Sequence, residues 1–152
     1  MTEIRDLLSY RLHVVANLLS RGAELRYRRE FGVSLWEWRT LALLGAASAP
    51  LSLNHLSHAA GIHTSLMSRV VSGLARRRLV RRAADPADAR GVHLELSRSG
   101  RKVYDGLIEA AAQRDAAFRD CLSRRERQVF DAALAKLAGQ ARAFIHGEKP
   151  AK

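Results

Sequence analysis

The sequence predicts a mainly α-helical fold with a small β wing of two or three strands. Apolar residues recur every three or four positions through most of the 152 residues, and serines able to cap helices precede several of these stretches. One short stretch, 92–97, instead alternates apolar and polar side chains, as a strand does. With 47% hydrophobic residues the chain can bury one ordinary core, so we expect a single domain over 1–145 and a disordered tail over 146–152.

The first helix is expected over residues 4–30. Its apolar positions are spaced by four, three and four residues, as on one face of a helix, and Gly32 ends it. These positions are Leu8, Leu12, Val15 and Leu19.

Serines mark the next two helix starts. Ser34, followed three residues later by Glu37, is a capping box that predicts a helix from about Leu35 until the chain approaches Pro50. Ser52 can cap a short third helix, which Gly61 ends.

A fourth helix begins after only three residues, 61–63, and has two different faces. One is apolar, with Met67, Val71 and Leu74, while the other is small, polar and basic. Two short helices joined by a tight glycine-containing turn are typical of a helix-turn-helix, and the polar face suits a DNA major groove. The candidate DNA-binding residues on this helix are Thr64, Ser65, Ser68, Arg69, Ser72 and Arg76.

Residues 79–84 and 92–97 are expected to form a β-hairpin, because turn-forming residues fill 85–91 between them. This wing completes a winged helix-turn-helix lobe over about 35–97. Arg82 on the first strand and Arg90 at the tip are further candidate DNA contacts, with Arg90 in the minor groove.

Two long helices are expected after the hairpin. Ser97 can cap a fifth helix that runs to about Asp120, and Ser123 with Glu126 is another capping box, which opens a sixth. The sixth helix carries one apolar stripe, formed by Phe130, Leu134, Leu137, Ala141 and Phe144.

The charge distribution indicates a polyanionic partner. Lys and Arg total 26 against 15 Asp and Glu, a formal net charge of +11. Residues 69–102 contain ten basic side chains and three acidic ones. Because this excess coincides with the helix-turn-helix and the hairpin, duplex DNA is favoured over a merely solvated surface.

The motifs 56–62, 65–74 and 79–90 resemble the MarR family of winged helix-turn-helix transcription regulators, and the 94–100 stretch resembles its strand-to-helix junction. The chain departs from that pattern at Ala89, where the family often has a second Arg, and at Arg77 and Arg78, where a Gly is common.

The resemblance implies a homodimer whose dimerisation lobe is built from the helices at about 4–30 and 98–145. It also implies a pocket for a small aromatic or phenolic anion between these helices and the DNA-binding lobe. Polar groups on otherwise apolar helices make His13, Asn17 and Arg39 the candidate ligand-binding residues.

Several classes of site are not expected. His55 and His58 are at helical spacing but have no third ligand nearby, so we expect no metal. No catalytic constellation or phosphate-binding glycine loop is present, so we expect neither an enzyme nor a cofactor. Cys121 is the single cysteine, which excludes an intrachain disulfide and leaves a redox role open. Without a signal peptide or membrane span, the expected location is the bacterial or archaeal cytoplasm, at the nucleoid.

Two functions stay open. The first is a sequence-specific dimeric regulator that binds a pseudo-palindromic operator and acts as a repressor released by its ligand. The alternative is an architectural or anti-silencing DNA-binding protein with little sequence preference and no effector. The two differ in the ratio of specific to non-specific affinity, which is ~10³ or more for the first.

Overall fold

The computed structural model describes residues 3–83 and 93–147. The chain divides into two compact units, 1–111 and 112–152, which are described separately below. The helix α5, Arg98–Asp120, is continuous through the boundary between them.

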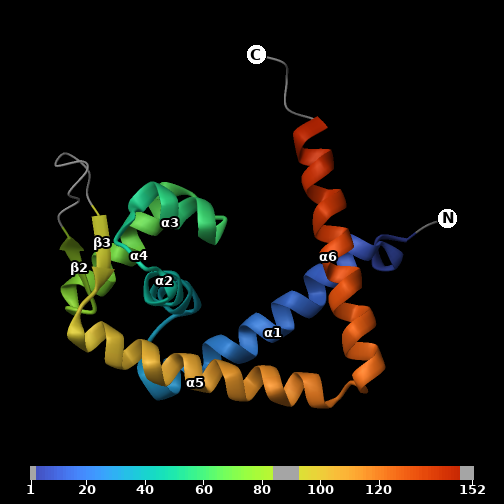
Figure 1. Cartoon of the computed structure of the whole chain (residues 1–152), viewed down its shortest axis with the longest axis horizontal. Helices are drawn as coiled ribbons and strands as arrows, with labels where there is room; N and C mark the ends of the chain where they lie inside the picture. The colour runs from blue at the N-terminus through green and yellow to red at the C-terminus, as the bar shows by residue number, and fades with distance from the viewer. Residues whose placement is uncertain (1–2, 84–92, 148–152) are drawn as a thin grey trace. The chain divides into compact units, whose positions relative to one another are not determined.

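The first unit contains every strand found among the described residues and most of the helices (Figure 1). In chain order its elements are η1 (Ile4–Asp6), α1 (Leu8–Phe31), α2 (Leu35–Ala46), β1 (Leu51–Ser52), α3 (Leu53–Ala60), α4 (Thr64–Arg76), β2 (Val80–Ala83), β3 (His93–Leu96) and the first turns of α5.

The predicted caps are all in place in this unit. The Ser34 side chain accepts a hydrogen bond from the Glu37 amide while the Glu37 carboxylate accepts one from the Ser34 amide, so the capping box is complete. The Ser52 hydroxyl accepts from the His55 amide, and the Ser97 hydroxyl accepts from the Gly100 amide at the start of α5. These local signals set the helix boundaries within a residue or two of those expected.

The first helix differs from its prediction at the N-terminal end. Residues 4–6 form a separate 3-10 turn, and Leu7, with extended backbone angles, interrupts the helix before α1 begins at Leu8. The N-cap residue Leu7 makes no side-chain cap hydrogen bond, so the sequence carries no capping signal at this break. At the other end Gly32 ends α1 in the left-handed conformation, as expected.

The sheet is three-stranded and antiparallel, with the order β1-β3-β2. In β3, Leu94 lies opposite both Leu51 of β1 and Arg82 of β2. The third strand, whose identity the sequence left open, is therefore the residue pair just before α3. The middle of the hairpin, 84–92, lies outside the described residues.

The core of this unit lies where α2, α3, α4 and α5 meet beside the sheet. The largest side chains with no exposed surface are Leu41, Leu56, Met67, Leu74 and Leu107. The Tyr27 ring packs against the Trp38 ring with 5.4 Å between centroids, which ties α1 to this core. The core fixes α4 so that its other face is presented to solvent.

The second unit contains the end of α5 and the helix α6, Arg124–Gly147. The predicted capping box holds the turn between α5 and α6, which we call the α5–α6 elbow. The Ser123 amide donates to the Glu126 carboxylate at 2.7 Å and the Glu126 amide donates to the Ser123 hydroxyl. The Arg119 guanidinium also binds both Asp115 of α5 and Asp131 of α6, at 2.8 and 3.2 Å. No residue of α6 is buried within this unit.

Candidate nucleic-acid interface

The turn between α3 and α4 has the geometry of a helix-turn-helix. Gly61 adopts a left-handed conformation with φ 67°, and its amide and that of Ile62 bond back to the carbonyls of His58 and Ser57. Three residues then separate the two helices, and α4 begins at Thr64. The Thr64 hydroxyl lies 3.2 Å from the Ser57 hydroxyl, which links the start of α4 to α3.

The helix α4 is strongly two-faced, as predicted. Met67, Val71 and Leu74 are buried in the core. All six candidate DNA-binding residues of this helix are exposed: Thr64, Ser65, Ser68, Arg69, Ser72 and Arg76. The structure therefore places these six on the solvent side of one rigid helix, where a DNA groove could reach them.

The hairpin supplies a second exposed basic element. Arg82 is exposed on β2, while its neighbour Arg81 forms an ion pair of 2.6 Å with Glu95 on β3. The proposed wing-tip contact Arg90, together with Ala89, lies outside the described residues. Of the two candidate wing residues, the structure thus places only Arg82.

The basic cluster of residues 69–102 separates into two groups. Arg77 pairs with Glu37 at 3.1 Å, Arg81 pairs with Glu95, and Arg101 donates to the Gly45 carbonyl and stacks on Tyr104. Arg90 lies outside the described residues. The other cations of the cluster make no ion pair with any residue the structure describes; they are Arg69, Arg76, Arg78, Arg82, Arg98 and Lys102. Fewer charges are available to phosphates than the composition alone indicates.

Position along α4 further divides these cations. Ser65 and Arg76 are separated by about 16 Å along the axis, from the rise of 1.5 Å per residue. Arg76, Arg78 and Arg98 lie in sequence next to the end of the sheet at which Val80 of β2 pairs with Leu96 of β3.

The three candidate ligand-binding residues are not brought together. His13 and Asn17 are exposed on α1 and hydrogen-bond to each other at 2.8 Å. Arg39 is half-buried on α2, where its guanidinium stacks on the Trp36 ring at 4.8 Å and lies 3.4 Å from the Ser20 hydroxyl.

Arg39 lines a groove of about 400 Å³ between α2 and α3. Its other walls are apolar and were not predicted from the sequence: Trp38, Ala42, Leu43, Ala46, Ala59 and Ala60. No local sequence signal marks them, because the small alanines lie on two separate helices and leave room for a ligand only where these helices pack together. His13 and Asn17 do not line this groove.

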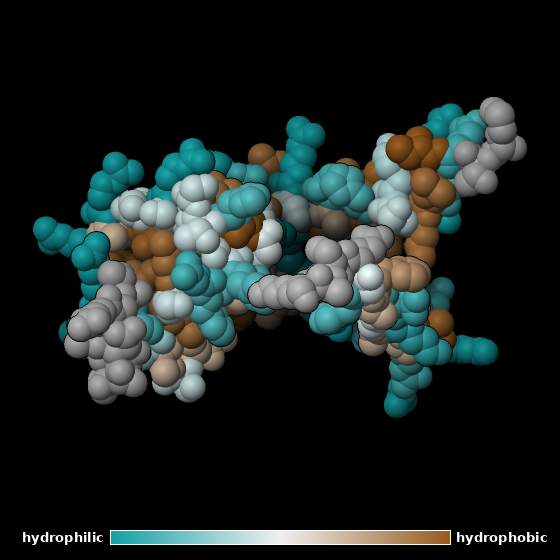
Figure 2. Space-filling view, turned by 90° about the horizontal axis from the view of Figure 1, so that it is seen from above, coloured by the Kyte–Doolittle hydropathy of each residue, from teal (hydrophilic) through white to brown (hydrophobic). Residues whose placement is uncertain are grey.

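Hydrophobic side chains reach the surface among the hydrophilic ones, as Figure 2 shows in brown. Several come from α1 and α6, including Leu8, Val15, Phe130 and Phe144, the last of which is 64% exposed. The apolar stripe on each of these two helices is therefore not covered within its own unit.

Comparison with known proteins supports the identity of the DNA-binding lobe. The sequence model of the MarR family matches residues 31–91, which contain the helix-turn-helix and the strand β2. The winged-helix region of this chain is similar to that of the MarR family. The resemblance predicted from the motifs is thereby confirmed. The search of the curated proteins found no match.

Solved structures show that the MarR fold extends over the chain. A MarR/EmrR family regulator from Acinetobacter sp. ADP1 is 22% identical, with a TM-score of 0.83 over 93% of this chain and 99% of that one. MepR of S. aureus, in a structure with DNA, is 21% identical, with a TM-score of 0.79 over 88% and 98%. A probable regulator from Pseudomonas aeruginosa is 23% identical, with a TM-score of 0.71 over 89% and 99%. The predicted fold class is confirmed.

The structure also bears on membrane-spanning, metal-binding and redox sites. No helix among the described residues is long and apolar enough to cross a membrane. Within the same residues no group of three or more His, Cys, Asp or Glu side chains is placed to hold a metal ion. Cys121 is exposed, with its Sγ 2.9 Å from the Phe118 carbonyl oxygen.

Proposed function

We propose that this protein is a sequence-specific DNA-binding transcription regulator that inserts α4 into the major groove. The observation that carries the proposal is the exposed face of α4, on which hydroxyl and guanidinium groups stand together without acidic side chains. Such groups donate to base edges and phosphates. The solved relative MepR, similar in fold at 21% identity, has been crystallised with DNA.

The exposed residues divide into two roles. Ser65, Ser68, Arg69 and Ser72 lie along the N-terminal and middle turns, where a recognition helix meets base edges. Arg76 and Arg82 are assigned to phosphates, because Arg76 ends the helix and Arg82 extends from the hairpin. Arg90 remains the proposed minor-groove contact.

The experiment compares Arg69→Ala with Arg21→Ala, an exposed arginine of α1 that provides the same loss of charge away from the helix-turn-helix. The probes are a duplex selected from random DNA by the wild-type protein and a scrambled duplex of equal length. Arg69→Ala is expected to cost ~1–3 kcal/mol on the selected duplex and little on the scrambled one. Equal losses on both duplexes would show that Arg69 contacts phosphates rather than base edges. No loss on either would contradict the proposed interface.

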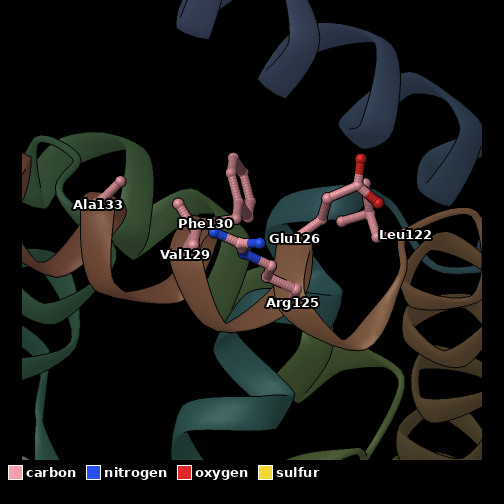
Figure 3. A pocket seen from close by; sticks show the side chains of 6 residues that line it. All are labelled: Leu122, Arg125, Glu126, Val129, Phe130 and Ala133. Carbon is pink, nitrogen blue, oxygen red and sulfur yellow. The ribbon is translucent and has the colours of Figure 1, made fainter.

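We further propose that the regulator is a homodimer. In the second unit, a hollow of about 510 Å³ lies along the start of α6. Figure 3 shows the Phe130 ring standing out from the helix, with Val129 and Ala133 to one side and Glu126 and Leu122 to the other. An apolar surface that is exposed to water in this way is typical of a site where proteins associate. A second copy of the chain supplies matching apolar stripes from its own α1 and α6.

The proposed effector is a small aromatic anion bound in the groove between α2 and α3, and its binding would release a repressor from DNA. Arg39 supplies the cation, and the alanine-rich walls supply apolar contact for a ring. Calorimetric titration with salicylate as the probe should give binding that Arg39→Ala weakens at least about tenfold, or 1.4 kcal/mol, and that Arg21→Ala leaves unchanged. Equal binding by the two variants would contradict this site.

A further inference from the structure

The connector between α4 and β2 ends the recognition helix with a complete Schellman motif. The Arg78 amide donates to the Ala75 carbonyl and the Leu79 amide donates to the Leu74 carbonyl, both at 2.9 Å. Leu74 and Leu79 are both buried, as the apolar contact of this motif requires.

Arg78 occupies the position in this motif that favours glycine. Its φ is 58°, and it is the one non-glycine residue with a positive φ in the described part of the chain. A left-handed backbone is unfavourable for an arginine, so surrounding contacts must hold it there. Those contacts come from the start of α5.

Two serines bind the Arg78 carbonyl. The Ser97 and Ser99 hydroxyls lie 2.6 and 2.7 Å from its oxygen, which has two lone pairs and can accept from both. The Ser97 amide also donates to the Leu79 carbonyl at 3.0 Å. The end of α4 is therefore bound to the start of α5 by three hydrogen bonds.

Ser97 serves both helices at once. Its hydroxyl donates to the Arg78 carbonyl at the end of α4 and accepts from the Gly100 amide at the start of α5. Gly100 allows this close approach, because a Cβ there would lie 1.8 Å from the Leu79 carbonyl oxygen. We call residues 78, 79, 97, 99 and 100 the α4–α5 joint.

We propose that Ser97 is a positioning residue for the recognition of paired DNA half-sites, because it fixes the recognition helix α4 to the first turns of α5. This inference rests on the proposed function. A dimer on a two-fold operator must place its two recognition helices about one helical turn of DNA apart. A rigid joint holds the distance between the two recognition helices fixed. A loosened joint lets each recognition helix adjust to a half-site at a different spacing.

The test measures affinity against half-site spacing. The probes are a duplex selected from random DNA by the wild-type protein, the same duplex with one base pair added or removed between half-sites, and a duplex with one half-site. The wild type is expected to lose about tenfold or more when the spacing changes, and Ser97→Ala about threefold or less. Affinity for the single half-site should be the same for both proteins, because the Ser97 hydroxyl is bound to Arg78 and Gly100 and is not one of the proposed DNA contacts.

Two variants separate the joint from simple loss of stability. Ser97→Thr keeps the hydroxyl and should restore the steep dependence on spacing. Arg78→Gly keeps the carbonyl while removing the unfavourable backbone conformation, so it should retain the steep dependence and raise Tm by about 2–4 °C.

The inference is overturned if Ser97→Ala depends on spacing as steeply as the wild type, or if Ser97→Thr behaves like Ser97→Ala. Should Ser97→Ala fail to fold, Ser99→Ala decides, since it removes one bond to the Arg78 carbonyl and leaves the α5 cap intact. If the affinity of Ser99→Ala depends on half-site spacing less steeply than that of the wild type, the proposed role of the joint is supported. If it depends on spacing as steeply as the wild type, the inference is overturned. If selection enriches no sequence at all, the proposed function fails and the inference falls with it.

Discussion

At the scale of single residues, the helix caps join partners three residues apart, whereas the α4–α5 joint also binds residues that are distant in sequence. Ser34, Ser52, Ser97 and Ser123 were all expected to cap helices, and each accepts from an amide three residues later. A cap is readable because both partners lie in one short motif. The contact of Ser97 with Arg78, 19 residues away, was not predicted, because it depends on how α4 and α5 meet in space.

The capping box at the α5–α6 elbow should make part of the stability pH-dependent. Hydrogen bonds from the Ser123 side chain, and then from its backbone amide, lower the pKa of the Glu126 carboxyl. A lowered folded-state pKa means that the stabilisation is present above the unfolded value of about 4.3 and is lost as pH falls through the folded value.

Thermal melts of the wild type and Glu126→Gln from pH 7 to pH 3, at one protein concentration, test this expectation. The wild type should have the higher Tm at pH 7, and the difference should shrink as the pH falls below about 4. A difference that stays constant over this range would show that the carboxylate charge does not stabilise the cap.

At the scale of elements, the sequence predicted which segments are helical and where the helix-turn-helix lies. It did not predict where two elements approach each other closely. The predicted fourth helix matches α4 because its buried and exposed faces repeat with the helical period. The groove between α2 and α3 was missed, because alanines on two separate helices give no signal until the helices are packed. Likewise, nothing local distinguishes Gly100, which touches another element, from Gly139, which does not.

These two helical glycines form a matched pair. A Cβ at Gly100 meets the Leu79 backbone, which cannot step aside like a flexible side chain, so Gly100→Ala should lower the free energy of unfolding by about 1–3 kcal/mol or more. Nothing lies within 4 Å of a Cβ at Gly139, so Gly139→Ala should raise it by up to about 1 kcal/mol through helix propensity. Urea unfolding at fixed protein concentration measures both. Equal stability of the two variants would contradict the close approach of α5 to the connector.

At the scale of the whole molecule, the apolar stripes of the first and sixth helices were expected to pack against a second chain. Neither stripe is covered within its own unit, where Val15 of α1 is 53% and Phe144 of α6 is 64% accessible. Stripes of this kind have no stabilising role in a monomer, which is why we propose that the partner is another copy.

The dimer can be tested with a charged side chain at the centre of the α6 hollow. Phe130→Asp should shift the mass measured by light scattering at micromolar concentration from two chains to one, because an unpaired carboxylate would be buried against apolar surface. Gln128→Asp, an exposed position of the same helix that does not line the hollow, is the control and should stay dimeric. A wild-type protein that is monomeric both free and on DNA would contradict the dimer.

The central claim is that the exposed face of α4 reads sequence. The most direct measurement is the ratio of wild-type affinities for the selected duplex and for a scrambled duplex of equal length, at one physiological salt concentration. A specific regulator predicts a ratio of ~10³ or more. Nearly equal affinities for the two duplexes would contradict the account and favour an architectural protein that coats DNA through its basic surface.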